Sequence, residues 1–139
     1  MSDSLEAKIK RRIIIPPKFT NTSLEVNYFV PRFKKILKGD KLEWVNQDSK
    51  IHHLKFYKIV GEEVEFLFDL GRIQPNKTSL ANFDFDFPRI DYLCTLHTNE
   101  IGTIIIYPKS ESEMSNAQQI RFLSKIFNIK PLWGHSESG

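Results

Sequence analysis

The sequence lacks most of the features that mark familiar chemistries. It has a single cysteine among 139 residues, so an internal disulfide is excluded. No apolar run approaches the ~20 residues of a membrane-spanning helix. There is no Gly-rich phosphate loop, no Ser-His-Asp arrangement and no cysteine pair of a zinc site, which argues against nucleotide and hydrolytic chemistry. The only methionines are Met1 and Met114.

The composition is that of one globular domain. Hydrophobic residues make up 40% of the chain and charged residues 27%. A chain of 139 residues can bury a real core but is too short for two ordinary domains. The net charge is +3, from 20 Lys and Arg against 17 Asp and Glu. This modest excess suits an acidic protein partner or an anionic surface and is too small to indicate nucleic acid.

The first residues do not have the pattern of an export signal. Residues 1–12 are polar and end in basic side chains, and only Ile13, Ile14 and Ile15 follow before the first proline. Three residues are too few for the ~7–15-residue apolar core of a signal peptide. Two possibilities stay open, a chain that works in the cytoplasm from a native Met1 or an exported form that was trimmed. We expect residues 1–12 to form a flexible arm.

From Ile13 onward the pattern is that of β-structure. Short runs rich in Val, Ile, Phe and Tyr alternate with turn signals at the spacing of a β-sandwich. In residues 83–87 Phe and Asp alternate strictly, which places the phenylalanines toward the core and the aspartates toward water. The predicted strands are 12–15, 24–30, 34–38, 41–47, 51–60, 64–69, 79–87, 90–94 and 102–107.

Beyond Pro108 a helix is predicted, over about residues 113–128. Ser115 and Gln118 fit a capping box, and an apolar face is formed by Ile120, Leu123, Ile126 and Phe127. This helix either covers an edge or open face of the sandwich or docks a partner.

The single cysteine has two groups of histidines as candidate neighbours. Cys94 precedes His97 by three residues between two predicted strands, and the pair His52-His53 lies on another strand about forty residues upstream. A thiolate with two imidazoles is the ligand set that copper favours in trigonal sites. The pattern therefore predicts a copper site.

Several stretches of the chain resemble the cupredoxin family. They are Tyr28–Pro31, Lys38–Asp48 with His52, Gly71–Asn76, and the closing Tyr92-x-Cys94-x-x-His97-x-x-Glu100-x-Gly102, which has the short, plastocyanin-like form of the ligand loop. The resemblance implies an all-β Greek-key β-sandwich over residues 13–108, with the C-terminal helix and tail over 109–139. It also implies one bound copper ion, usually for electron transfer, and a place outside the cytoplasm.

Carrying the family's ligands over gives His52, Cys94 and His97. The step from Asn46 and Asp48 to His52 matches the family's N-x-D-x-x-x-H pattern and favours His52 over His53. Neighbours on a strand point to opposite faces, so only one of the two histidines can meet Cys94, and a slip of one residue in register would make it His53. His53 and Asn46 are then the candidates for supporting the ligands through hydrogen bonds.

Glu100 stands where relatives with this short loop usually carry methionine. No methionine is available within the sandwich, so Glu100 is the candidate fourth ligand. A hard carboxylate favours Cu(II) and lowers the reduction potential. The resulting ligand types resemble those of the red copper protein nitrosocyanin, which predicts a red or green-shifted site. The alternative is a solvated loop carboxylate.

Three functions fit these residues. The first is one-electron transfer rather than catalysis, to a redox partner steered by Lys34, Lys35, Lys38, Lys50 and Arg72. The second is a red-copper-like protein that binds or transforms a small molecule such as nitric oxide. The third is a non-redox copper carrier, which ranks last because the chain has no exposed cluster of Met, His or Cys.

Overall fold

The structure is a computed structural model in which residues 11–17, 29–97, 100–108 and 114–127 are described. Most of the predicted arm, most of the predicted strand 24–30 and the C-terminal tail lie outside these ranges. None of the helices in the described ranges is long and apolar enough to cross a membrane.

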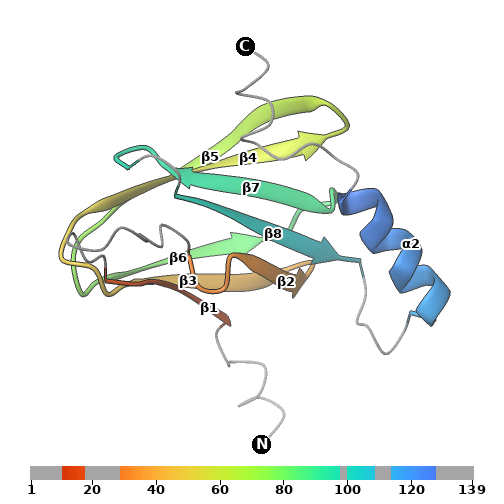
Figure 1. The fold of residues 1–139 in the computed structure, drawn as a ribbon, viewed down its shortest axis with the longest axis horizontal. Helices are drawn as coiled ribbons and strands as arrows, with labels where there is room; N and C mark the ends of the chain where they lie inside the picture. The colour runs from red at the N-terminus through yellow and green to blue at the C-terminus, as the bar shows by residue number, and fades with distance from the viewer. Residues whose placement is uncertain (1–10, 18–28, 98–99, 109–113, 128–139) are drawn as a thin grey trace, which may run out of the picture.

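Two β-sheets face one another, as Figure 1 shows. The three-stranded sheet has the order β1 (Arg11–Ile15), β3 (Asp40–Asn46) and β6 (Thr78–Phe83). The five-stranded sheet has the order β2 (Phe33–Leu37), β8 (Ile101–Tyr107), β7 (Arg89–Cys94), β4 (His52–Val60) and β5 (Glu63–Ile73). Neighbours in the sheets are mostly not neighbours in the chain, so the connections cross between the layers. The predicted Greek-key β-sandwich is confirmed.

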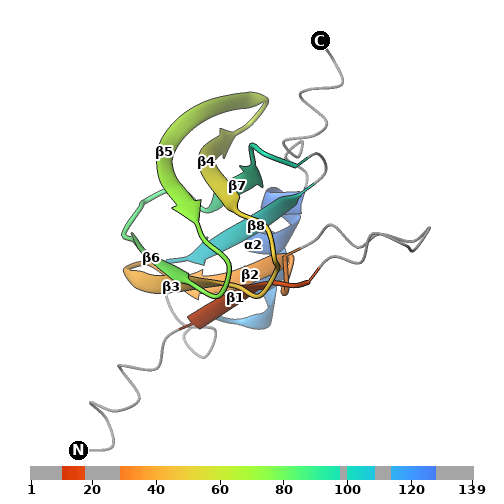
Figure 2. The same ribbon diagram turned by 90° about the vertical axis from the view of Figure 1, so that its left-hand side faces the viewer.

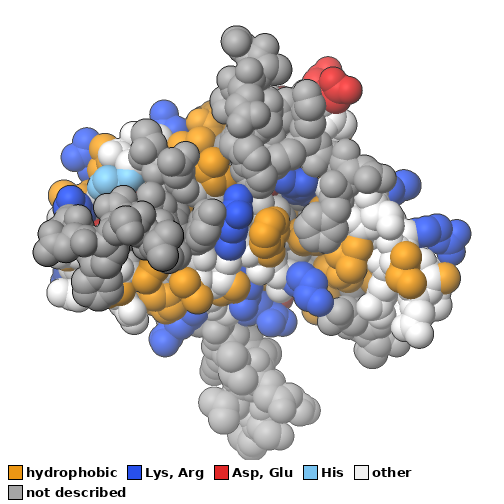
Figure 3. Space-filling model, viewed as in Figure 1, with side chains coloured by type: hydrophobic (Ala, Val, Ile, Leu, Met, Phe, Trp, Pro, Cys, Tyr) orange, Lys and Arg blue, Asp and Glu red, His pale blue; other side chains and the backbone are white. Residues whose placement is uncertain are grey.

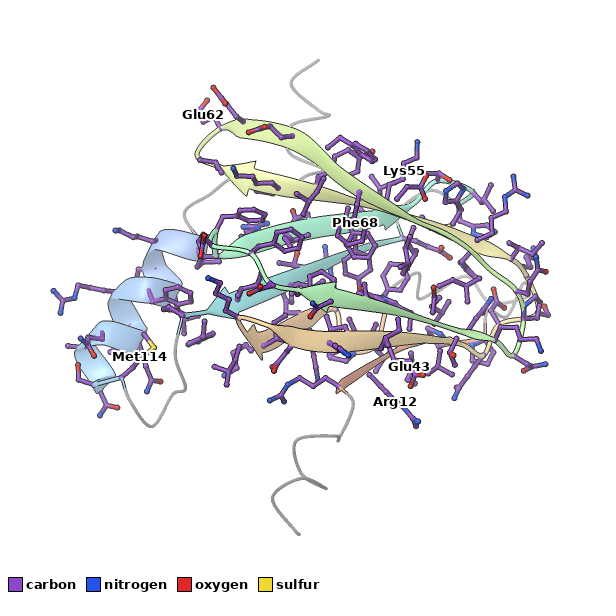
Figure 4. All side chains as sticks on the ribbon, turned by 180° about the vertical axis from the view of Figure 1, so that it is seen from behind. Arg12, Glu43, Lys55, Glu62, Phe68 and Met114 are labelled. Atoms are coloured by element: carbon purple, nitrogen blue, oxygen red, sulfur yellow. The ribbon has the colours of Figure 1, made fainter. Side chains whose placement is uncertain are left out.

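An aromatic cluster fills the space between the sheets. Trp44, Phe56, Phe83 and Tyr92 are all 0% exposed, and the Trp44 ring lies 5.2 to 5.9 Å from the other three. Phe68 of β5 stacks on Phe56 at 4.5 Å and points into this layer, as labelled in Figure 4. Close packing of this kind holds the strand ends in a fixed relation to one another.

The first strand begins earlier than predicted. Arg11 pairs with Asp40 at 2.7 Å and Arg12 with Glu43 at 2.9 Å, so both arginines belong to the sheet and not to the arm. Figure 4 shows the Arg12 and Glu43 pair on the outer side of the three-stranded sheet.

The alternating Phe-Asp segment is only partly a strand. β6 ends at Phe83, which pairs with Asp40, the first residue of β3. Phe85 and Phe87 still pack against the core, and Asp84 and Asp86 are exposed, so the predicted faces are right. The predicted strand to residue 87 is wrong. The alternation specifies the faces of the side chains, whereas a strand also needs a hydrogen-bonding neighbour, and the pairing of β6 with β3 ends at Phe83 because β3 begins at Asp40.

The C-terminal helix, α2 (Asn116–Phe127), covers the outer face of the five-stranded sheet. The capping box is present, since the Ser115 and Gln118 side chains each accept the other's backbone N–H. Phe122, Leu123 and Ile126 pack on Ile105 and Tyr107 of β8, which favours the covering role over partner docking. Ile120 is 65% exposed, so its predicted place on the apolar face is wrong, and the Phe127 side chain lies outside the described residues. Figure 2 shows α2 against the sheet.

The ends of four strands meet at one end of the sandwich. β3 and β7 end there and β4 and β8 begin there, at the left of Figure 1, whereas α2 lies at the right. The predicted ligands therefore fall together at the end of the molecule away from the helix.

Candidate metal centre

Four side chains converge at this end of the sandwich. His52 opens β4, Cys94 closes β7, and His97 and Glu100 lie in the connection between β7 and β8. Each offers one ligand atom, and these atoms all lie within 4.8 Å of one another. Among the described residues this is the group of His, Cys and acidic side chains that is arranged to hold a metal ion. The structure thus brings together the four predicted residues and leaves the imidazole of His53 outside the group.

His52 lies between two carboxylates. It is 0% exposed, its Nδ1 is 2.9 Å from Glu100 Oε1, and its Nε2 is 2.9 Å from Asp48 Oδ2. A neutral imidazole carries one N–H, so both contacts are hydrogen bonds only when the site holds a second proton. Burial lowers the pKa of His52, but hydrogen bonds with Cys94, Glu100 and Asp48 outweigh it and raise the pKa to about 10.

We expect the metal-free protein to lose stability as the pH rises from about 6.5 to about 10. Because the pKa of His52 is higher in the folded chain, its protonation stabilises the fold. That contribution is complete below about 6.5 and is lost as the pH passes through about 10. Urea unfolding midpoints across this range test the sign, and the dependence should be shallower in Asp48→Asn. Midpoints that rise over the same range would contradict it.

Cys94 is placed to act as a thiolate ligand. Its side chain is buried, at 4% exposure, and two backbone N–H groups point at the sulfur, from Leu96 at 3.4 Å and from His53 at 3.5 Å. His97 Nδ1 lies 3.4 Å from the same sulfur. Backbone donors stabilise negative charge on sulfur, and they tie the loop that follows Cys94 to β4.

Glu100 is not a solvated loop carboxylate, because it is only 2% exposed. Its Oε1 lies 2.9 Å from His52 Nδ1 and 3.3 Å from His97 Nδ1. A carboxylate loses strongly favourable hydration on burial unless it is paired, so its place between two imidazoles needs a compensating cation or proton.

Asp48 is a further candidate site residue, which the sequence reasoning did not select. It is 3% exposed and holds the ring of His52 from the side opposite Glu100. Asn46 positions it, since the Asn46 Oδ1 accepts the Asp48 N–H at 2.9 Å and the Asn46 Nδ2 donates to the carbonyls of Lys50 and Ile73. A carboxylate four residues before the candidate histidine is the sequence signal from which this contact could have been predicted.

His53 contributes its backbone and not its side chain. Its N–H donates to Cys94, whereas its imidazole turns to the other face of β4 and contacts Asp69 at 2.7 Å. Neighbouring residues on a strand alternate in direction, so His52 and His53 separate in the way the strand period requires.

The fold is similar to that of several solved structures. A purple cupredoxin from Nitrosopumilus maritimus is similar over 70% of this chain and 100% of its own, with 21% identity and a TM-score of 0.58. Amicyanin from Paracoccus versutus is similar over 72% of this chain and 83% of its own, with 22% identity and a TM-score of 0.52. A copper-containing nitrite reductase from Thermus scotoductus is similar over 73% of this chain and 23% of its own, with 20% identity and a TM-score of 0.50.

No protein-family model and no curated relative matches the sequence. At identities of 21 and 22%, the structural likeness establishes the architecture. The order of strands, the aromatic core and the position of the four converging side chains agree with it. The chain has the cupredoxin fold.

Proposed function

We propose that the chain binds one copper ion through His52, Cys94, His97 and Glu100 and transfers single electrons. The observation that carries the proposal is the convergence of one sulfur, two imidazole nitrogens and one carboxylate oxygen within 4.8 Å. Bound there, copper would cycle between Cu(I) and Cu(II). The similar structures named as a purple cupredoxin and a copper-containing nitrite reductase support the choice of metal.

The donor set fits copper. Thiolate and imidazole suit copper in both oxidation states, and a trigonal set of two histidines and one cysteine is typical of electron-transfer copper sites. Glu100 adds a hard anionic donor, which favours Cu(II). The positive charge of the copper ion would also compensate the buried negative charge of Glu100. In the metal-free site a proton on His52 has this role.

The exposure of the ligands favours electron transfer over small-molecule chemistry. His52, Cys94 and Glu100 are 0%, 4% and 2% exposed, whereas the side chain of His97 is 30% exposed. Glu100 would supply a fourth ligand from the buried side of the site, so the copper ion would not need a substrate or solvent molecule as its fourth ligand. An electron would leave through the exposed edge of His97.

Basic residues near this end support an acidic partner. Lys50 lies in the connection between β3 and β4, and Arg72 lies near the end of β5. Lys38 is excluded from this role because it pairs with Asp86 at 2.6 Å at the opposite end, where β3 begins. Figure 3 shows Lys and Arg side chains spread over one face, with acidic side chains mainly at its upper edge. We propose that an acidic partner docks beside His97.

Glu100→Met should strengthen the blue thiolate-to-copper band and raise the reduction potential, and Glu100→Gln should shift both in the same direction. The reason is that each variant removes a hard negative donor that stabilises Cu(II). Visible absorption, EPR and potentiometry of the copper-loaded proteins measure the change. A wild-type spectrum dominated by the ordinary blue band, and unchanged in Glu100→Gln, would rule out ligation by Glu100.

Asp48→Asn should weaken copper binding about tenfold, because partners of a metal-bound histidine typically contribute 10- to 100-fold to affinity. The amide keeps the size of the side chain but loses the charge that orients the His52 ring. Competition with a calibrated chelator gives the affinity. Asp86→Asn is the matched control, since it removes one exposed carboxylate at the far end of the sandwich. Equal copper affinities in Asp48→Asn and Asp86→Asn would show that Asp48 does not contribute to copper binding.

Voltammetry of the copper-loaded protein tests the function itself. One reversible one-electron wave that is unchanged by nitrite, azide or nitric oxide is the expected result. A spectrum and potential that shift on adding these molecules would establish a small-molecule site. Transfer of copper to a metal-free acceptor, without redox cycling, would establish a carrier.

A further inference from the structure

We propose that His53 and Asp69 form a positioning pair that fixes the backbone hydrogen bond to the Cys94 sulfur. The inference rests on the proposed metal centre, which it deepens by naming residues that tune the thiolate from outside the ligand set. The pair lies on the outer face of the five-stranded sheet, on β4 and β5, and the sulfur belongs to Cys94 of the neighbouring β7 and lies on the inner side of the sheet.

The backbone N–H and C=O of His53 both point toward β7 and the loop that follows it. Its N–H donates to Cys94 Sγ at 3.5 Å, and its carbonyl accepts the N–H of Thr95 at 2.8 Å. A residue in an antiparallel strand directs its N–H and C=O toward the same neighbour. The N–H and C=O of His53 therefore point away from β5, although His53 stands opposite Arg72 in the register.

The side chain of His53 forms a hydrogen bond to β5. Its Nε2 lies 2.7 Å from Asp69 Oδ1, and the same oxygen accepts the backbone N–H of Gly71 at 2.7 Å. An N–H of His53 must donate in this contact, because the carboxylate can only accept. One carboxylate oxygen thus joins the imidazole of β4 to the backbone of β5.

An irregularity in the strand pairing makes this geometry possible. Leu54 pairs with Gly71 and Lys55 with Asp69, so Leu70 is an extra residue in β5. Such a bulge bends the strand and redirects its side chains, and Gly71 supplies the positive φ of 88° that the bend uses. The extra residue places Asp69 opposite Lys55, which is two residues from His53 on the same face of β4. In a regular ladder Asp69 would stand opposite Phe56, whose side chain points to the other face.

The contact adds little to overall stability but constrains one donor. The His53 side chain is 21% exposed and that of Asp69 is 37% exposed, and pairs this accessible contribute little to folding. The hydrogen bond from His53 to sulfur, at 3.5 Å, is long, so small rotations of this peptide change its strength. Fixing the imidazole limits that rotation.

Asp69→Ala and His53→Ala test the pair, with Asp69→Asn as the conservative variant, because its amide oxygen still accepts both N–H groups. In the copper-loaded protein, each alanine variant should move the thiolate-to-copper band to longer wavelength and lower the reduction potential. In the metal-free protein, the amide proton of residue 53 should exchange at least about tenfold faster, since local opening sets its protection. Asp69→Asn should restore the wild-type values.

Phe66→Ala is the matched control. Phe66 contacts Tyr57 across the same two strands at 5.8 Å and is 57% exposed, so its loss also removes a cross-strand contact on this face. The control should leave the band, the potential and the exchange of residue 53 unchanged. Wild-type behaviour in both alanine variants would overturn the pairing role, as would an effect in Asp69→Ala that is absent in His53→Ala. If the wild-type protein showed no thiolate-to-copper band, the proposed copper centre would be wrong. The positioning role of His53 and Asp69 would still be tested by amide exchange in the metal-free protein.

Discussion

Cys94→Ser should abolish the visible thiolate-to-copper absorption and lower copper affinity by more than about a hundredfold. The loss should exceed that for an outer hydrogen-bond partner, which is about 10- to 100-fold. Serine places a hydroxyl at nearly the same position, but this group stays protonated at neutral pH and is a poor ligand for Cu(I). The two backbone N–H groups that point at the sulfur would then face a neutral oxygen.

The fold should survive this substitution. Cys94 is 4% exposed and forms no disulfide, and serine is slightly smaller, so the metal-free variant should unfold within about 1 kcal/mol of wild type. Chelator competition and absorption measure binding, and urea unfolding of the metal-free proteins is the control. Retention of a strong visible band in Cys94→Ser would show that the sulfur is not a ligand.

Gly102→Ala should lower the free energy of unfolding by about 3 kcal/mol, the upper part of the usual range for overpacking a core. Gly102 pairs with Tyr92 across β7 and β8, and an added Cβ would meet the Cζ and hydroxyl of Tyr92 and lie 2.6 Å from its Cε1. The tyrosine ring has no room to move away. It is 0% exposed and lies 4.8 Å from the ring of Phe29 and 5.3 Å from that of Trp44.

The same substitution should also disturb the metal centre, because Gly102 lies two residues after Glu100. Urea unfolding gives the stability. Gly61→Ala is the control, because nothing lies within 4 Å of its added Cβ and only its positive φ of 60° resists the change, at about 1 kcal/mol. If Gly102→Ala were no more destabilising than this control, the packing of Tyr92 against the glycine would be wrong.

The sandwich and the grouping of the four candidate side chains were predictable because both follow from patterns within short stretches of sequence. The period of two along the strands assigned inward faces correctly, including the opposite directions of His52 and His53. The Cys94 to His97 step places both residues at the end of one strand and the start of its loop. The capping box located the start of α2 for the same reason, since Ser115 and Gln118 contact each other locally.

The parts that could not be predicted depend on contacts between distant segments. The burial of Glu100 and its contact with His52 join residues 48 apart in the chain. The end of β6 at Phe83 depends on where its antiparallel neighbour β3 begins, and the outward position of Ile120 depends on how α2 packs on β8. The bulge that brings Asp69 to His53 likewise arises from the pairing of β4 with β5.

Titration of the metal-free protein with Cu(II), followed by visible absorption, tests the central claim most directly. One thiolate-to-copper band should grow linearly and stop at one equivalent of copper, and it should be absent in Cys94→Ser. A titration without such a band, or one that gives the same spectrum in Cys94→Ser, would contradict a copper centre built from His52, Cys94, His97 and Glu100.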